Sequence, residues 1–446
     1  MSKINIDKEI LRIALPAVVA NITIPILGLI DLAIAGHLGN SAFIGAMSVG
    51  AMMFNLTYWN FGFLRMGTSG ITAQAYGSGN AAAMRNSLLR AVALAMLIAL
   101  CILLLQYPIQ WLALYIISPS ASVEALARQY FLIVIWGAPA VLVMMSLKGW
   151  FLGMQDSQSA MRISLCVDLL NVLASLVAVY VLKMGFVGIG VGTLVAEYVG
   201  LAYGCWLVVH KHRSLLAGAI LGDMLRLAEV RRMMAVNGHI FFRSLCLIVV
   251  TLSFVSIGAR SGDMILAANA IIMQLYILFS YTMDGVAFAG EALVGRFVGE
   301  RDNQERRRCV KHLMMWGVAL MMVYVAAYGI FPQQIFSALT DDASVVAVAL
   351  DYRWWCMAIP VASMAAFVWD GVFIGQTDTQ GMLYTVAVAC ATYFCIYFLL
   401  PIPAGNNRLW LAFIVFLLMR SVVQTAIWFV REKKYAAHSS QLKRNV

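Results

Sequence analysis

Long apolar segments recur along almost the whole chain, and each has the ~20 residues that cross a bilayer as a helix. Hydrophobic residues make up 62% of the sequence and Asp, Glu, Lys and Arg only 12%, whereas an average soluble chain has about 25% charged residues. A soluble protein of this composition could not cover its own surface, and disordered chains are far more polar. The 446 residues allow about twelve spans. The sequence therefore predicts an all-α integral membrane protein with twelve transmembrane helices.

Most of the 31 Lys and Arg residues fall in alternate polar segments between these spans. The basic segments are the N-terminus, 85–90, 148–162 (with Lys148), 211–232, 296–311 and the tail after 430. Basic residues collect on the cytoplasmic side of membrane helices, so we expect both termini in the cytoplasm. The expected spans themselves contain Arg65, Arg243, Arg353 and Arg420.

The chain repeats itself at an offset of 222 residues. Residues 149–158 (GWFLGMQDSQ) and 371–380 (GVFIGQTDTQ) share the pattern G-x-F-x-G-x-x-D-x-Q. Gly77 likewise matches Gly299, and Tyr130 matches Tyr352. With six spans in each half the repeats run parallel, as in transporters whose two bundles surround a central cavity. We therefore expect two six-helix bundles related by pseudo-two-fold symmetry.

The two bundles are expected over residues 1–210 and 233–446, and residues 211–232 join them. In this linker apolar and charged residues alternate, which is typical of a helix on the cytoplasmic membrane surface. Its apolar residues are Leu221, Met224, Leu225 and Ala228.

Six carboxylates fall inside predicted spans, where a charge costs a few kcal/mol. They are Asp31, Asp168, Glu197, Asp284, Glu291 and Asp370. A carboxyl group in such surroundings can exchange a proton near neutral pH. The alternative for any one of them is a charge at a helix end, or a salt bridge that holds helices together.

Spacing groups several of these residues on common helix faces. Asp168, Asn171 and Ser175 stand at i, i+3 and i+7, and Asp284 and Glu291 at i and i+7. Arg243 is the candidate partner of a second-half carboxylate, either in function or as a structural ion pair.

Pro16 and Pro25 precede Asp31 in the first span. A proline removes a backbone hydrogen bond and permits a kink, so the charge of Asp31 could be coupled to the shape of this helix. The alternative is that the prolines merely bend a packing helix. In the second span Met52 and Tyr58, with Phe54 and Trp59, could form an adaptable cavity wall, or could face lipid and neighbouring helices.

Residues 67–70 read Gly-Thr-Ser-Gly, the G-x-S-G pattern of intramembrane serine proteases. Residue Glu291 aligns with Ser69 in the repeat, and a histidine partner would have to come from another helix, so we do not expect an enzyme. There is no Walker sequence and no H-E-x-x-H in the chain. We expect no cofactor and no metal site.

The motifs together resemble the multidrug and toxic compound extrusion (MATE) transporters, and the resemblance is closest to the DinF-like branch. It rests on Leu15-Pro16, Asp31 and Gly36-His37 in the first span, residues 72–77 (TAQAYG), and the duplicated G-x-F-x-G-x-x-D segment. It implies two six-helix lobes around a central cleft, and efflux of organic cations driven by a proton or sodium gradient. It also implies a multi-pass protein of the bacterial cytoplasmic (inner) membrane.

In this resemblance Asp31 matches the proton-binding carboxylate of the first lobe, and Asn171 and Ser175 match the Asn-x-x-x-Asp pair of the fifth span. Serine replaces the aspartate here, and Asp168, one turn earlier, is a candidate to take its place. Asp284, Glu291 and Asp370 match acidic positions of the second lobe. Sodium-coupled members carry a glutamate in the seventh span, where this chain has Arg243, so the resemblance favours proton coupling.

The expected function is therefore antiport of lipophilic organic cations or amphiphilic drugs against protons by alternating access. A sodium-coupled drug antiporter and a flippase for lipid-linked precursors are the alternatives. We expect contacts with membrane lipids, none with nucleic acid, and a monomer.

Overall fold

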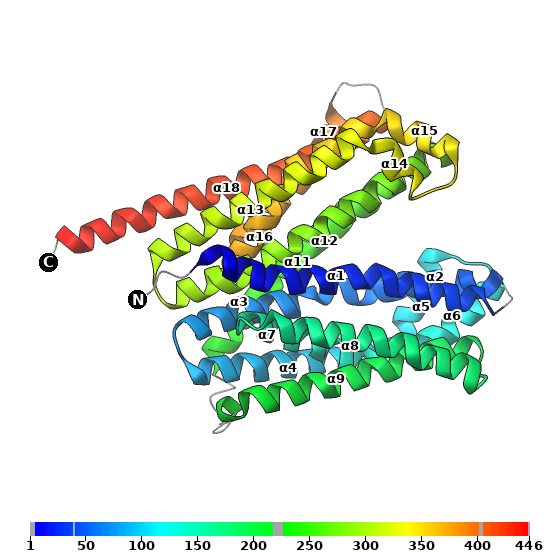
Figure 1. The fold of residues 1–446 in the computed structure, drawn as a ribbon, viewed down its shortest axis with the longest axis horizontal. Coiled ribbons are helices and arrows are strands. Elements are labelled where there is room, and N and C mark those ends of the chain that lie inside the picture. The colour runs from blue at the N-terminus through cyan, green and yellow to red at the C-terminus, as the bar shows by residue number, and fades with distance from the viewer. Residues whose placement is uncertain (1–4, 39–40, 217–225, 401–404, 445–446) are drawn as a thin grey trace.

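The computed structural model describes residues 5–38, 41–216, 226–400 and 405–444, and every regular element in these ranges is a helix. Eleven helices there are long and apolar enough to cross a membrane. Two lobes lie side by side in Figure 1, one built from the first half of the chain and one from the second. The all-helical, two-bundle fold expected from the sequence is confirmed.

The first lobe carries the prolines and the first group of carboxylates. Its helices are α1 (Ile6–Gly36), α2 (Ser41–Tyr58), η1 (Trp59–Gly62), α3 (Phe63–Gly77), α4 (Ala81–Leu104), α5 (Gln106–Ile117), α6 (Ala121–Val134), η2 (Ile135–Gly137), α7 (Ala138–Gly153), α8 (Ser157–Leu176), η3 (Val177–Val181) and α9 (Phe186–Leu216).

The second lobe begins with the helix that follows the linker. Its helices are α11 (Leu227–Ala259), α12 (Asp263–Gly299), α13 (Asn303–Ile330), α14 (Pro332–Ser337), α15 (Ala343–Asp351), α16 (Arg353–Gly375), α17 (Thr379–Leu399) and α18 (Asn406–Arg444).

Several elements differ from the sequence-based expectation. The expected second span, 43–76, is divided by the 3-10 turn η1 into α2 and α3, because Asn60 and Gly62 are poor helix formers. The short helix α5 was not expected. Residues 217–225, the centre of the expected amphipathic linker helix, lie outside the described residues. The boundaries of the lobes at 210 and 233 stay predictions.

Helices α3 and α12 cross on the pseudo-two-fold axis. The Ser69 hydroxyl donates a hydrogen bond to Glu291 Oε2 at 2.5 Å, and the two residues are 222 positions apart, which is the repeat offset. A Cβ on Gly295 would lie 2.5 Å from the Cβ of Ala73, again its repeat equivalent. Residues that contact their own equivalents lie on a two-fold axis. The internal duplication is therefore visible in the packing.

Two further contacts at this crossing form a reciprocal pair. A Cβ on Gly77 would lie 1.9 Å from the Arg296 carbonyl oxygen, and one on Gly299 would lie 2.1 Å from that of Gln74. Only glycine allows the two backbones to approach this closely. We call the end of the molecule where α3 and α12 end the convergent end. Toward the opposite end, which holds α2, α5, α14 and α15, the lobes diverge in Figure 1.

The repeated D of the G-x-F-x-G-x-x-D pattern has the same role in both lobes. Asp156 caps α8 and Asp378 caps α17, each by accepting a backbone N–H three residues later. Each also pairs with a basic residue, Lys211 at 2.7 Å and Arg431 respectively. Burial alone would raise the pKa of Asp156, but hydrogen bonds from Lys211 and Ser159 outweigh it and lower the pKa.

We predict that Gly77→Ala destabilises the protein by about 1–3 kcal/mol, because the added methyl group meets backbone atoms that must move. Thermal unfolding of the purified protein in detergent measures the effect. Gly238→Ala is the matched control, since a Cβ on Gly238 in α11 has no heavy atom within 4 Å. Equal unfolding midpoints for the two variants would show that the helices are not in close contact at Gly77.

Candidate functional site

Asp31 is a buried carboxylate without a salt bridge among the described residues. It lies on α1, is 8% exposed, and its Oδ1 atom has no hydrogen-bond partner. Helix α1 continues through Pro16 and Pro25 without a break, and Figure 1 draws it without a sharp bend. The two prolines therefore lie in a continuous helix in this conformation, and their role as a kink stays a prediction.

Asp31 belongs to a group of polar side chains in the first lobe, which we call the N-lobe cluster. Tyr130, from α6, lies close enough to Asp31 and Glu197 to interact electrostatically with both, and the Thr193 hydroxyl is beside it. Asn171 donates to Thr193 Oγ1 at 3.2 Å and accepts from the Ser175 hydroxyl at 3.4 Å. The cluster consists of Asp31, Tyr130, Asn171, Ser175, Thr193 and Glu197.

Glu197 is 9% exposed, and its Oε2 atom has no hydrogen-bond partner in the part of the chain that the structure describes. Tyr58 of α2 interacts with it electrostatically. Phe54 stacks on Tyr58 and on Phe131 of α6, so these aromatic rings fill the interface between α2 and α6. Met52 is 53% exposed. Of the two residues expected to form a cavity wall, Met52 is thus exposed and Tyr58 is packed against Phe54.

Asp168 does not join Asn171 and Ser175, although the three residues share a helix. Its Oδ2 atom accepts a hydrogen bond at 2.5 Å from the Thr23 hydroxyl of α1. Lys148 of α7 interacts with it electrostatically. Lys148 was expected with the cytoplasmic residues but lies inside an apolar helix long enough to span a membrane. It lies five residues before the helix end at Gly153, and its side of the membrane stays a prediction.

Asp370 belongs to a group of polar side chains in the second lobe, which we call the C-lobe cluster. The cluster consists of Arg243, Asp284, Asp370, Arg420 and Gln424. The Oδ2 atom of Asp370 accepts from Arg243 and from Arg420, the latter at 2.8 Å. Gln424 donates to its Oδ1 atom at 2.8 Å. Arg243, Asp370, Arg420 and Gln424 are buried, and Asp284 is half-buried. Charge-assisted bonds of this kind are strong, and they hold the carboxylate in one position.

Glu291 connects the two lobes. Arg65 of α3 donates to both of its carboxylate oxygens, at 3.0 and 3.2 Å, and Ser69 donates to one of them. Glu291 is 1% exposed, and Arg65 also lies 4.0 Å from the centroid of the Phe288 ring. This bidentate pair is a buried tie between α3 and α12.

Asp284 is the second-lobe carboxylate without an ion pair among the described residues. It is half-buried and interacts electrostatically with Arg65, Glu291, Asp370 and Arg243. Arg353, expected within a span, is exposed at the first residue of α16. It is the first residue of the candidate span Arg353–Gly375, because Asp351 and Tyr352 end the separate helix α15 before it.

The roles assigned to the individual site residues stay predictions. The structure brings together Asn171 with Ser175, and Arg243 with Asp370, and separates Asp168 from its expected neighbours. Sequence reasoning missed Thr193, for which no signal exists in the sequence, and Tyr130, which stands out only through its repeat match to Tyr352. No group of three or more His, Cys, Asp or Glu side chains suited to a metal ion is found among the described residues.

Three comparisons place the chain among known proteins. The MatE family pattern matches residues 16–177 and 240–398, one stretch in each half. The DNA damage-inducible protein F of Escherichia coli K12 is 34% identical over 425 residues, which cover 95% of this chain and 92% of that protein. The probable multidrug resistance protein NorM of Photorhabdus laumondii is 21% identical, with 89% and 86% covered.

The fold is shared with solved transporter structures. That of the Vibrio cholerae MATE transporter VcmN in the bent form superposes with a TM-score of 0.83 at 16% identity, covering 96% of both chains. The family pattern matches both halves of the chain, a relative is similar over almost its whole length, and the fold is shared. These three findings point to the same family. This chain belongs to the MatE family of multidrug and toxic compound extrusion transporters.

Proposed function

We propose that the protein exports organic cations in exchange for protons, and that Asp31 carries the exchanged proton. The supporting observation is the contrast between Asp31 and the second-lobe acids. Asp31 is buried with an oxygen that no described group bonds, whereas arginines hold Glu291 and Asp370. Removing the charge of a carboxylate that arginines hold would leave buried positive charge without a partner. A carboxyl group without such partners can take up and release a proton.

The N-lobe cluster gives Asp31 a polar route for this proton. Tyr130 interacts with both Asp31 and Glu197, and Asn171 connects to Thr193 beside it. Hydroxyl and amide groups act both as donors and as acceptors, so they can bond either form of a carboxyl group. Ser175 stands at the end of this network, in the place where the family pattern has an aspartate.

Negative charge favours a cationic substrate. Of the ionisable residues that the sequence places within spans, six are acidic (Asp31, Asp168, Glu197, Asp284, Glu291 and Asp370) and four are basic (Arg65, Arg243, Arg353 and Arg420), and Lys148 adds a fifth basic residue. Asp284 has no ion pair among the described residues and could hold a cation between the lobes. A proton and a cationic substrate exclude one another when both need the same negative charge, which is the requirement for antiport.

The arrangement of the lobes supports alternating access as the mechanism. Polar contacts close the convergent end: Gln74 Nε2 donates to the Gly375 carbonyl oxygen at 2.9 Å, and Gln155 Nε2 to that of Ala292 at 2.7 Å. The basic segments of the chain lie at this end, so we assign it to the cytoplasm. The conformation is then outward-facing, in a protein of the bacterial inner membrane with both termini in the cytoplasm.

Sodium coupling and lipid-precursor flipping are the competing functions. Sodium coupling would require that a carboxylate ligand bind the ion in place of the proton. Flipping of a phosphate-bearing lipid would require an excess of positive charge between the lobes, and the count of charges opposes it. The gradient experiment below separates the three.

We predict that liposomes containing the protein move a fluorescent lipophilic cation under a pH gradient, and that Asp31→Asn reduces this movement to the level of protein-free vesicles. The variant retains the shape of the side chain but cannot exchange a proton. Asp341→Asn, at an exposed site, is the matched control and should transport normally. Movement under a sodium gradient alone would support sodium coupling, and phospholipid scrambling without cation movement would support a flippase.

We predict that Asp370→Asn costs about 3–5 kcal/mol of stability, because it leaves two buried arginines without their carboxylate. The double variant Asp370→Asn/Arg420→Gln should recover part of this loss, and Asp31→Asn should unfold at the same temperature as the unsubstituted protein. Thermal unfolding in detergent measures all three. A stable Asp370→Asn variant that selectively loses proton coupling would move the coupling site to the second lobe.

We predict that Glu291→Gln loosens the convergent end. Breaking a buried pair worth about 3 kcal/mol raises the opening equilibrium by roughly two orders of magnitude. Backbone amides of residues 67–77 should then exchange hydrogen faster, as mass spectrometry can measure. Glu124→Gln, which breaks an exposed pair with Arg128 of 2.8 Å, should leave this exchange unchanged. If both variants exchange alike, the Arg65–Glu291 pair does not hold the lobes together.

A further inference from the structure

A cavity of about 490 Å³ lies at the convergent end between the two lobes. The first lobe contributes the last turns of α3 and the start of α4, and the second contributes the start of α11 and the end of α12. Its lining includes Gln74, Asn86, Arg90, Arg226, Arg232 and Arg301. Helices α4, α11 and α12 are long and apolar enough to cross a membrane, and the cavity lies at their ends, where a span meets the boundary between hydrocarbon and water.

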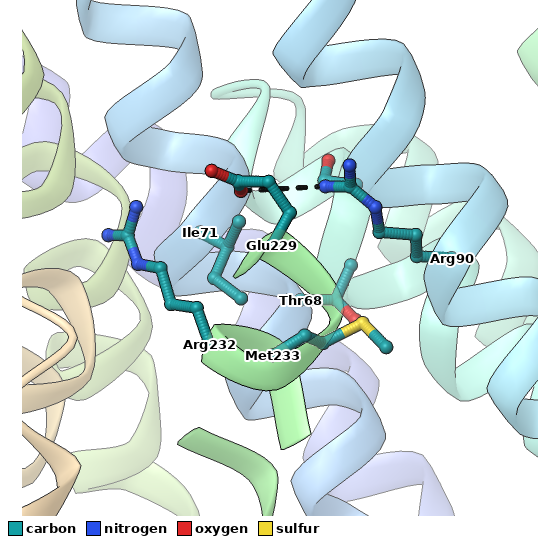
Figure 2. A pocket seen from close by; sticks show the side chains of 7 residues that line it. Thr68, Ile71, Arg90, Glu229, Arg232 and Met233 are labelled. Atoms are coloured by element: carbon teal, nitrogen blue, oxygen red, sulfur yellow. Dashed lines mark ion pairs between the residues drawn. The ribbon is translucent and has the colours of Figure 1, made fainter. Parts of the chain in front are cut away.

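Positive charge dominates this cavity. Four arginines line it, and Glu229 is the single carboxylate among the lining residues. Arg90 pairs with Glu229 at 3.5 Å and is itself 8% exposed. Figure 2 shows Glu229 between Arg90 and Arg232, over a smaller hollow lined by Thr68, Ile71 and Met233. Among the described lining residues four guanidinium groups face one carboxylate, so this lining carries more positive than negative charge.

The cavity also offers uncharged hydrogen-bond donors. Helix α4 begins at Ala81 after its cap Asn80, and Ala82 and Ala83 line the cavity. The first-turn N–H groups of a helix have no acceptor within the helix and attract anions. Asn80 already accepts from Ala83, which leaves the N–H of Ala82. Asn86, one turn further, is 7% exposed; its Oδ1 atom, which has no partner among the described residues, is an acceptor and does not add to these donors.

We propose that this cavity binds a phosphate-bearing anion. Arginine forks match phosphate oxygens in geometry and charge, and amide donors at a helix start complete such a site. At the depth of the span ends a phosphate can come from two sources, the headgroup of an anionic phospholipid or free phosphate from solution. The volume exceeds that of a lone phosphate ion, which favours a headgroup.

The bound anion connects the lobes. Arg90 belongs to α4 of the first lobe, and Arg226 and Arg232 belong to the start of α11 in the second lobe. Arg232 already donates to Gln74 across the interface at 2.9 Å. A ligand that contacts both sides binds only while the convergent end is closed, and it therefore shifts the equilibrium toward that state. This consequence rests on the proposed alternating access, whereas the binding itself does not.

The test is the unfolding midpoint of the purified full chain in detergent with three separate additives: short-chain phosphatidylglycerol, inorganic phosphate and short-chain phosphatidylcholine. We expect phosphatidylglycerol to raise the midpoint by about 2–5 °C and phosphatidylcholine to raise it much less. The variant Arg226→Gln/Arg301→Gln should lose this rise. This variant retains Arg90, which pairs with Glu229, and Arg232, which donates to Gln74.

The matched control is Arg260→Gln/Arg353→Gln, which removes two exposed arginines away from the cavity and should keep the full rise. A rise with inorganic phosphate that the cavity variant abolishes would identify free phosphate as a sufficient ligand. Equal rises with both lipids, a rise that persists in the cavity variant, or no rise with any additive would overturn the proposal. The unfolding assay uses no ion gradient. A failure of anion binding can therefore be distinguished from a failure of transport. The midpoint without additive reports whether each variant folds.

Discussion

The contact between α3 and α12 on the pseudo-two-fold axis is the feature on which the rest of the structure depends. Lipid offers no water to solvate a charge or a free backbone group, so the lobes must satisfy polar groups against one another. At this crossing, glycines bring the backbones together, and the Arg65–Glu291 pair places opposite charges in the contact. The pair is asymmetric, because Arg65 aligns with Ala287 in the repeat. The close glycine contacts are present in both repeats, whereas the Arg65–Glu291 charge pair is not.

The two lobes use their buried acids differently. In the second lobe Asp370 lies between Arg243 and Arg420, so its charge is neutralised within the lobe. In the first lobe Asp31 and Glu197 each keep a buried oxygen without a partner among the described residues. Asp284 is the second-lobe intramembrane acid without an ion pair among the described residues, and it is half-buried. The buried, unpartnered oxygens of Asp31 and Glu197 support the proposal that the exchangeable charge lies in the first lobe.

Hydropathy, the positions of basic residues and the 222-residue repeat were sufficient to predict the helical membrane fold and its two halves. The intramembrane acids were also visible, because a charge in an apolar run stands out. Their partners were not, since Arg65 and Glu291 are 226 residues apart and Arg243 and Asp370 are 127 apart. The break of the second span at η1 has a local cause in Asn60 and Gly62, whereas the half-buried position of Lys148 depends on tertiary packing, which no local pattern reports. Nothing in the sequence distinguishes Thr193 from the other threonines in spans. Its place in the N-lobe cluster depends on the packing of α8 against α9.

Closure of the convergent end and charge in the N-lobe cluster are linked through α1. Asp7 at the start of this helix accepts hydrogen bonds from His312 and Trp316 of α13, at 2.8 and 3.1 Å. Thr23, midway, bonds Asp168 of α8, and Asp31 lies near the far end. Helix α1 therefore contacts α13 near its start, contacts α12 through Asn21, whose Nδ2 atom donates to the Tyr281 carbonyl oxygen at 3.4 Å, and carries Asp31 of the N-lobe cluster near its end. A change of charge at Asp31 that alters the packing of α1 must also alter its contact with α13, because a continuous helix transmits displacement along its length.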